Sequence, residues 1–318
     1  MCNLKNKILD ISHNHCEYLL NLQNVNGIGY GYKYVNGINT LEPCIHVLVK
    51  NKIDSKNMSK NNFIPKNYMG IKTDVIQVGD IVLENRNIFK NKVRPLQGGC
   101  NIGAAGINSY GTICCIVKKI VKINDEEMVF YYTLSNNHVL ADYNRYPIGS
   151  AFLQPSGTFN GKYPDDVIAG LETFIPIKFI DGTNKPINYV DCAIARIANH
   201  QLISNKILSI GIINGVTKPK VDMKIRKSGV STGLTYGYIT SLGISLKVDV
   251  SSLNKKAFFQ DQLLIQVETK PGDSGSSIIN ENNEIVGMHM GSGGDGYSVS
   301  NDINLVLDNL NVEVYTGV

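Results

Sequence analysis

The sequence has no tryptophan and only 8% aromatic residues, and no single sign of charge dominates it. Lys+Arg 31 against Asp+Glu 27 gives a net charge of +4, and no basic run occurs anywhere, so a nucleic-acid partner is not expected. No apolar run approaches the ~20 residues of a membrane span, and polar residues interrupt residues 1–15 before a signal-peptide core could form. We therefore expect no membrane partner.

The seven cysteines form no recognisable disulfide framework, because their number is odd and no C-x-x-C pair occurs. Reduced thiols and the lack of an export signal predict a cytoplasmic protein. Cys2, His13, His15 and Cys16 gather near the start, but their spacing matches no common zinc site. We expect no metal and no cofactor.

A small α+β domain is predicted at residues 1–92. Residues 4–22 have the apolar spacing of one helix. Residues 27–34 and 44–50 alternate as strands around Asn36-Gly37, a dipeptide typical of hairpin turns. A further strand is expected at 73–78, and the polar stretch 85–92 precedes the domain boundary.

From residue 93 to 318 the pattern changes to short β runs separated by Gly, Asn, Asp and Pro, which predicts a second, all-β domain. Few helical windows occur there, and only residues 304–310 indicate a helix that closes the domain. This spacing is typical of antiparallel sandwiches or barrels. The runs are 110–123, 128–134, 191–197, 236–244, 262–267, 276–279 and 284–290.

One loop of the β domain has the composition of a nucleophile site. Residues 270–276 read Lys-Pro-Gly-Asp-Ser-Gly-Ser, and the two glycines allow a tight turn that aims N–H groups toward the Ser274 hydroxyl. A serine needs a base to take its proton and a carboxylate to hold that base in the right tautomer. His138, just after an apolar strand, and Asp191, at the mouth of another, are the candidates.

Asp191 is preferred as the carboxylate because an alternating apolar strand follows it directly. Gly-Asp-Ser-Gly alone is a common turn, so the prediction depends on the three segments together. Three other aspartates lie between the base and the serine without such a strand: Asp165, Asp166 and Asp181.

The order His138, Asp191, Ser274, with intervals of 53 and 83 residues, and Gly-Asp-Ser-Gly at 272–275 resemble the trypsin-like, chymotrypsin-fold serine peptidases. The resemblance implies an all-β double six-stranded β-barrel behind the small first domain. It makes His138 the base, Asp191 the orienting carboxylate and Ser274 the nucleophile. The amides of Gly272 and Ser274 become the oxyanion hole. The expected activity is a serine endopeptidase acting on protein or peptide substrates through an acyl-enzyme, without a cofactor.

Further segments extend this resemblance to bacterial members. Residues 229–237 look like the Gly/Thr-rich turn and strand that precede the serine in that group. Residues 24–33, 71–76 and 98–103 are similar to a bacterial subgroup with a small leading domain, related to a plant leaf-shape peptidase.

Specificity is predicted from the positions that flank the serine. Thr269 and His289, five residues before and fifteen after Ser274, resemble the pocket of glutamyl endopeptidases, which implies an acidic residue before the cleaved bond. Glu268 departs from that pattern, since a carboxylate in the pocket would favour Lys or Arg. Acidic, basic and small or apolar preferences stay open, as does a structural role for His289.

A rival hypothesis is a catalytically inactive, trypsin-fold binding or scaffold protein whose pocket is closed or misaligned. The first domain carries no catalytic constellation of its own. Its role and the assembly of the chain into a homo-oligomer stay open.

Overall fold

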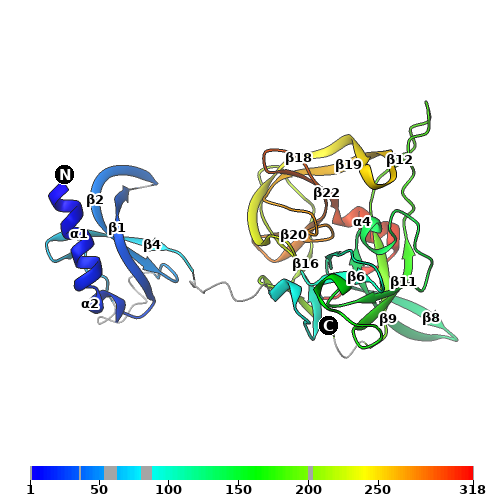
Figure 1. Ribbon diagram of the computed structural model, residues 1–318, viewed down its shortest axis with the longest axis horizontal. Helices are drawn as coiled ribbons and strands as arrows, with labels where there is room; N and C mark the ends of the chain where they lie inside the picture. The colour runs from blue at the N-terminus through cyan, green and yellow to red at the C-terminus, as the bar shows by residue number, and fades with distance from the viewer. Residues whose placement is uncertain (1, 36, 54–62, 80–87, 200–202, 318) are drawn as a thin grey trace. The chain divides into compact units, whose positions relative to one another are not determined.

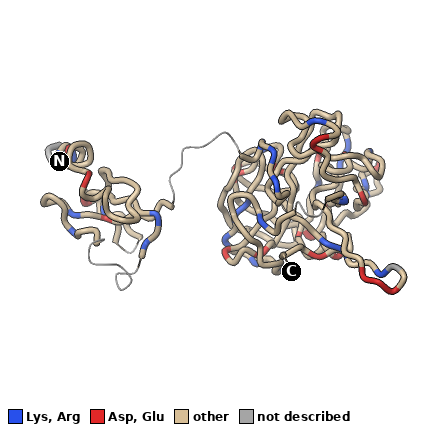
Figure 2. Tube along the Cα trace, turned by 90° about the horizontal axis from the view of Figure 1, so that it is seen from below, with Lys and Arg blue, Asp and Glu red and all other residues tan. Residues whose placement is uncertain are grey.

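The computed structural model describes residues 2–35, 37–53, 63–79, 88–199 and 203–317. The chain divides into two compact units, Met1–Arg86 and Asn87–Val318 (Figure 1). The domain boundary predicted after residue 92 stays a prediction, because the predicted linker lies partly outside the described residues. Basic and acidic residues are scattered over both units (Figure 2). None of the described helices has both the length and the apolar character needed to cross a bilayer.

The first unit packs two helices and a four-stranded sheet of order β1-β2-β4-β3. Strands β1 and β2 form an antiparallel hairpin, and β4 lies parallel to β2. Apolar residues of α1, such as Ile8 and Ile11, share one core with Ile45 and Val47 of β2. The elements are α1 (Cys2–Asn14), α2 (Glu17–Leu20), β1 (Val25–Val35), β2 (Ile38–Val49), β3 (Asn67–Tyr68) and β4 (Ile71–Gln77).

The predicted hairpin is confirmed, since pairing runs out to Val35 and Ile38; Asn36 itself lies outside the described residues. The single helix predicted over 4–22 is wrong, because two helices occupy that stretch with a break at His15 and Cys16. At the break, the His15 carbonyl accepts a hydrogen bond from the Tyr68 hydroxyl at 2.9 Å. The hydroxyl of a residue in β3 thus supplies the hydrogen bond that the His15 carbonyl would otherwise accept within a continuous helix.

The first half of the second unit is a ring of β strands. Strands β6, β10, β11, β13, β9 and β8 pair in that order, and β7 pairs with the free edge of β6. Since β7 and β8 follow one another along the chain, the ring closes through them. The strands are β6 (Asn101–Ala104), β7 (Gly111–Thr112), β8 (Ile116–Ile123), β9 (Glu126–Ser135), β10 (Ala151–Leu153), β11 (Val167–Phe174) and β13 (Ala193–Ile197).

The second half is another ring, in which β17, β18, β19, β22, β21 and β20 each pair with the next and β20 pairs back with β17. Figure 1 shows β18, β19, β20 and β22 in one part of the unit and β6, β8, β9 and β11 in the other. The strands are β17 (Lys224–Gly229), β18 (Gly233–Val250), β19 (Lys255–Gln266), β20 (Ser277–Asn280), β21 (Glu284–Ser292) and β22 (Tyr297–Asp302).

Short elements complete the unit. A small sheet has the order β15-β14-β5, and β12, β16 and β23 add to the edges of the larger sheets. The bounds are β5 (Leu96–Gly98), β12 (Ile187–Asn188), β14 (Ile203–Ile207), β15 (Gly211–Ile212), β16 (Gly215–Val216), β23 (Glu313–Val314), α3 (Asn137–Leu140), α4 (Ile303–Leu310), and the 3-10 helices η3 (Ile88–Lys90), η4 (Gly157–Phe159) and η6 (Ser251–Leu253).

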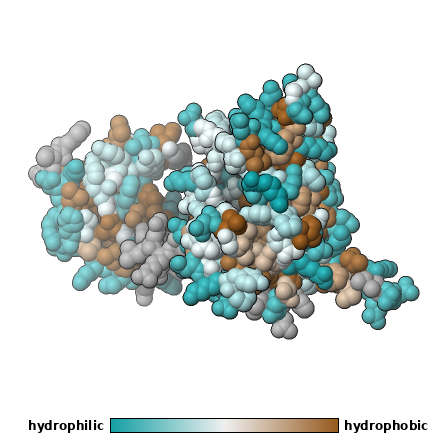
Figure 3. All heavy atoms as spheres, turned by 45° about the vertical axis from the view of Figure 1, so that its right-hand side comes forward, coloured by the Kyte–Doolittle hydropathy of each residue, from teal (hydrophilic) through white to brown (hydrophobic). Residues whose placement is uncertain are grey.

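One apolar cluster joins the two rings. It contains Leu134 of β9 and Cys192, which directly precedes β13, together with Ile279 and Met288 of the second ring and Leu307 of α4. A shared core makes the rings one body, so side chains at their junction have defined neighbours. On the face shown in Figure 3, apolar side chains of this unit are interspersed with hydrophilic ones.

The predictions of a mostly β chain and of a closing helix near residues 304–310 are confirmed. The single strand predicted over 110–123 is instead bent. Ile113 donates to the Cys100 carbonyl, whereas Cys114 donates to Leu134, so the chain leaves the β6 side of the ring and joins β9 within two residues. Strands β11, β17 and β22 lie outside the predicted β runs.

Candidate active site

His138 and Asp191 meet because the strands beside them pair. His138 lies in α3, directly after β9, and Asp191 precedes β13, whose first residue Ala193 pairs with Ser135 of β9. The Asp191 Oδ2 atom is 2.5 Å from His138 Nδ1, and its Oδ1 atom accepts the His138 amide at 3.1 Å. Asp191 is 2% exposed. A carboxylate on Nδ1 leaves Nε2 as the proton acceptor of the imidazole.

Two asparagines that the sequence analysis missed hold the Asp191 backbone. Asn136 Nδ2 donates to the Asp191 carbonyl at 2.9 Å, and the Asp191 backbone amide donates to Asn301 Oδ1 at 2.8 Å. Asn301 belongs to β22, so the second ring also positions the carboxylate. Neither asparagine lies in a recognisable motif, and only the packing of the rings identifies them.

Tyr143 stacks on the His138 imidazole, with ring centroids 5.7 Å apart and planes inclined by 22°. It lies in a run of three non-glycine residues with positive φ, Asp142 (46°), Tyr143 (57°) and Asn144 (73°). Such a run is uncommon for residues with a Cβ. Asn144 stabilises it by exchanging hydrogen bonds of 2.8 and 2.9 Å with the Ile177 backbone. The strained turn therefore holds an aromatic ring against the His138 imidazole.

Hydrogen bonds of Thr112 tie the Ser274 loop to the first ring. The Thr112 amide donates to the Ser274 carbonyl and its hydroxyl to the Gly272 carbonyl, both at 2.8 Å. The Thr112 carbonyl accepts a hydrogen bond from the Ser135 hydroxyl at 2.8 Å, and Ser135 lies three residues before His138 in the sequence. In the part of the chain that the structure describes, no hydrogen bond joins Ser274 Oγ to His138. Such contacts are often long until substrate binds.

The amide N–H groups of Gly272 and Ser274 donate to no acceptor among the described residues, whereas those of Asp273 and Gly275 are bonded to the Lys270 and His289 carbonyls. Gly272 has φ +100°, and a Cβ there would lie 2.3 Å from the Tyr110 ring. Only glycine fits that conformation and that space. Two unpaired donors beside a serine can stabilise an oxyanion.

A fully buried ion pair supports this loop from below. Lys227 Nζ, from β17, lies 3.1 Å from Asp273 Oδ2, and both side chains are inaccessible to solvent. The Thr232 hydroxyl donates to Asp273 Oδ2 at 2.7 Å, and Lys227 also donates to Thr232. The Ser231 amide donates to Asp273 Oδ1 at 2.9 Å and the Lys270 amide to Oδ2 at 3.0 Å. Every polar atom of the pair has a partner, as burial of two charges requires.

The charges of this pair respond to burial in opposite senses. Burial lowers the pKa of the Lys227 ammonium, and the Asp273 carboxylate opposes that shift. Burial alone would raise the pKa of Asp273, but the Lys227 charge and the hydrogen bonds from Thr232 and two backbone amides lower it overall. Asp273 therefore stays a carboxylate directly before Ser274.

The side of the loop predicted to bind substrate is lined with hydroxyl groups. Thr269 Oγ1 lies 2.7 Å from the hydroxyls of both Ser292 and Ser298. His289 is 1% exposed, its Nδ1 atom is buried without a hydrogen-bond partner, and burial lowers the pKa of its imidazole to about 3. The Glu268 side chain is 65% exposed, and its carboxylate lies 3.3 Å from Lys270 Nζ.

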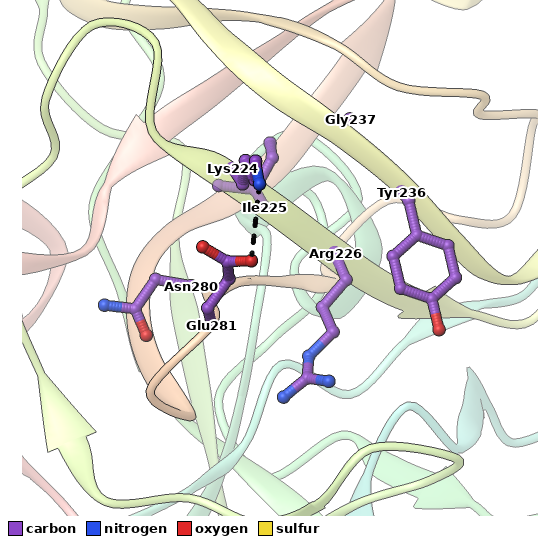
Figure 4. A pocket seen from close by; sticks show the side chains of 7 residues that line it. All are labelled: Lys224, Ile225, Arg226, Tyr236, Gly237, Asn280 and Glu281. Carbon is purple, nitrogen blue, oxygen red and sulfur yellow. Dashed lines mark ion pairs between the residues drawn. The ribbon is translucent and has the colours of Figure 1, made fainter. Parts of the chain in front are cut away.

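A separate cavity of about 330 Å³ lies on β17, β18 and the end of β20 and contains none of the predicted site residues (Figure 4). Its Lys224–Glu281 pair is exposed at 3.8 Å, and Arg226 donates to Asn283. Because its charged groups are paired or hydrogen-bonded to one another or to Asn283, we assign it no chemistry. The residues that line it are Lys224, Ile225, Arg226, Tyr236, Gly237, Asn280 and Glu281.

No family model matches this sequence, and no curated protein matches it. Among solved structures, it is similar to a Cellulomonas bogoriensis chymotrypsin at 20% identity, covering 69% of this chain and 98% of that one, with a TM-score of 0.46. Thermobifida fusca protease A gives 14% identity, 70% and 98% coverage and a TM-score of 0.49. The chain is also similar to a glutamic acid-specific serine protease that uses a histidine triad in substrate binding. The identity is 20%, the match covers 69% of this chain and 100% of that one, and the TM-score is 0.47. All three TM-scores are below 0.5.

We expect Lys227→Met to lower the free energy of unfolding of the second unit by about 3–5 kcal/mol, because Asp273 is left buried without its counter-charge. Lys224→Met is the matched control, on the same strand but with a 77% exposed side chain, and its effect should stay within about 0.5 kcal/mol. Urea unfolding measures both. Equal effects of the two substitutions would contradict the structural role of the ion pair.

We expect His289 to make the fold less stable as the pH is lowered. Its folded pKa of about 3 lies below the ordinary value of 6.5, so at intermediate pH only the unfolded chain binds the proton. The free energy of unfolding then decreases as pH falls from about 6 to 4, by about 1.4 kcal/mol per pH unit from this residue. His289→Gln should reduce that slope in urea titrations at several pH values. An unchanged slope would show that the imidazole is protonated in the fold.

Proposed function

We propose that the chain is a trypsin-like serine endopeptidase that hydrolyses peptide bonds through Ser274, His138 and Asp191. The observation that carries the proposal is the buried Asp191 carboxylate on His138 Nδ1. It occurs beside a serine loop with two unpaired amide donors. A base with its tautomer held and an anion site at a serine together favour acyl transfer.

In this mechanism His138 Nε2 removes the proton of the Ser274 hydroxyl as Oγ attacks the substrate carbonyl. The Gly272 and Ser274 amides stabilise the oxyanion, and Asp191 stabilises the imidazolium. His138 then protonates the departing amine, and water attacks the acyl-enzyme by the reverse sequence. Each step uses a group of the chain itself.

The finer description of the fold belongs to the same proposal. Two successive closed rings, with the candidate residues at their junction, support a double six-stranded β-barrel. The division of the chain supports a small α+β domain at 1–92 before a peptidase domain at 93–318.

For specificity we propose an acidic residue before the cleaved bond. The hydroxyls of Thr269, Ser292 and Ser298 can donate to a substrate carboxylate. His289 Nδ1 is buried and has no hydrogen-bond partner among the described residues. The orientation of Glu268 toward Lys270 at the surface disfavours the basic alternative.

One observation favours the rival, a catalytically inactive trypsin-fold scaffold. Within the described residues, Ser274 and His138 make no hydrogen bond to each other. A fluorophosphonate probe, which reacts only with an activated serine, distinguishes the two.

The enzyme should be labelled by the fluorophosphonate probe, with labelling abolished in Ser274→Ala and strongly reduced in His138→Ala, because both alcohol and base are needed. Gel fluorescence with circular dichroism of each variant measures this. Ser209→Ala, a serine outside the site, should label normally. A folded wild type that neither labels nor cleaves a peptide library would establish the scaffold.

Asp191→Asn should leave the protein folded but slow acylation by about 10⁴-fold, since the amide favours the wrong histidine tautomer. Stopped-flow acylation with an activated ester substrate gives the rate. Asp165→Asn, also between His138 and Ser274 in the sequence, should retain wild-type acylation. Normal turnover in Asp191→Asn would exclude that residue from the mechanism.

Two substrates that differ only in Glu or Gln before the cleaved bond test the specificity. We expect wild type to prefer Glu and Thr269→Val to lower kcat/KM for Glu selectively, because valine keeps the shape of threonine but lacks its hydroxyl. His289→Gln should act in the same direction. Equal losses on both substrates would assign Thr269 and His289 a structural role.

A further inference from the structure

The face of the first sheet that turns away from α1 carries three side chains able to bind a metal. Ile45 and Val47 of β2 belong to the helix-covered core, so Cys44 and His46, which alternate with them, lie on the opposite face. Strand β4 is parallel to β2, with Asp74 opposite His46. One sulfur, nitrogen or oxygen atom of each lies within 4.8 Å of the others.

Hydrogen bonds already orient two of these groups. His46 Nε2 donates to the Tyr32 carbonyl at 2.8 Å, which leaves the Nδ1 lone pair free. Asp74 Oδ2 accepts the Tyr34 amide at 2.8 Å, which leaves Oδ1 free. Both partners come from the end of β1. Backbone contacts of this kind hold metal ligands in productive orientations.

Gly31 provides the seat for the imidazole. A Cβ at this position would lie 2.1 Å from His46 Cε1 and 2.4 Å from Nδ1, so any larger residue displaces the ring. At Gly29, two residues earlier on the same strand and face, a Cβ would have no atom within 4 Å. The close approach is therefore specific to the histidine.

The charges around the thiol suit a cation. Cys44 is fully buried, and burial raises the pKa of its thiol; Asp74 raises it further, Lys33 opposes the shift and Glu42 adds to it. Glu42 also pairs with Lys72 at 2.7 Å. A dication would replace the thiol proton, so that thiolate and carboxylate together balance its charge.

We propose that Cys44, His46 and Asp74 bind one Zn²⁺ ion, with water as the fourth ligand. Zinc accepts this mixture of thiolate, imidazole and carboxylate in tetrahedral geometry, with bonds of about 2.0–2.3 Å that place ligand atoms roughly 3.5 Å apart. From the observed limit of 4.8 Å, the three atoms need to approach one another by at most about 1.3 Å.

A metal would also serve the stability of the first unit. Its core holds eight buried apolar residues, and small units with such cores are commonly reinforced by a metal or by disulfides. The ion would join β2 to β4 on the face that lacks helix cover. This inference is independent of the proposed peptidase activity and departs from the sequence-based expectation of no metal.

The test is titration of the reduced, metal-free full chain with ZnCl₂ by calorimetry, and with CoCl₂ by absorption spectroscopy. We expect one Zn²⁺ per chain, a thiolate-to-cobalt charge-transfer band and a zinc-dependent rise in the melting temperature of the first unit. Gly31→Ala should weaken binding by about 10–100-fold, the range for loss of ligand positioning, whereas Gly29→Ala should bind as wild type does.

Asp74→Asn provides a second variant that keeps the acceptor for the Tyr34 amide, and it should weaken zinc binding at least as strongly as Gly31→Ala. Circular dichroism checks that each variant is folded. A folded wild type that takes up no zinc overturns the proposal. So does zinc or cobalt binding that Gly31→Ala and Asp74→Asn leave unchanged, because the ion would then lie elsewhere.

Discussion

The chemistry of the larger unit depends on how Thr112 joins its two halves. Its amide and hydroxyl hold two carbonyls of the Ser274 loop, and its own carbonyl accepts Ser135 at the end of β9. His138 and the Ser274 loop come from different rings. Their separation is therefore set by a few short bonds at the junction, reinforced by an apolar core that both rings share.

Burial of charge fixes the shape of the serine loop. Asp273 is held by Lys227, Thr232 and backbone amides. A different loop conformation would leave a buried charge without its partners, which is strongly destabilising. Among the described residues, the neighbouring amides of Gly272 and Ser274 have no acceptor. The loop that carries these two donors is thus held by an ion pair whose side chains are both inaccessible to solvent.

The first unit uses its polar groups differently. One face of its sheet is apolar and covered by α1, whereas the other collects Cys44, His46 and Asp74 with the end of β1 above them. A thin sheet with one covered face has little apolar area to bury. Groups that can bind a cation on the open face offer a second source of stability.

Alternation and turn dipeptides are local properties of the chain, and they sufficed to predict the mostly β unit, the first hairpin and the closing helix. The order of His138, Asp191 and Ser274 can also be read directly from the sequence. His138 Nδ1 lies 2.5 Å from Asp191 Oδ2, whereas the catalytic roles implied by that order stay predictions. Lys227, Tyr143, Asn301 and the Cys44–His46–Asp74 group escaped prediction, as did the break in the first helix at His15. Each depends on segments distant in sequence, whose packing decides which buried polar atoms find partners and which stay free. No local pattern encodes that outcome, because it follows from where the strands close and not from the residues beside each other.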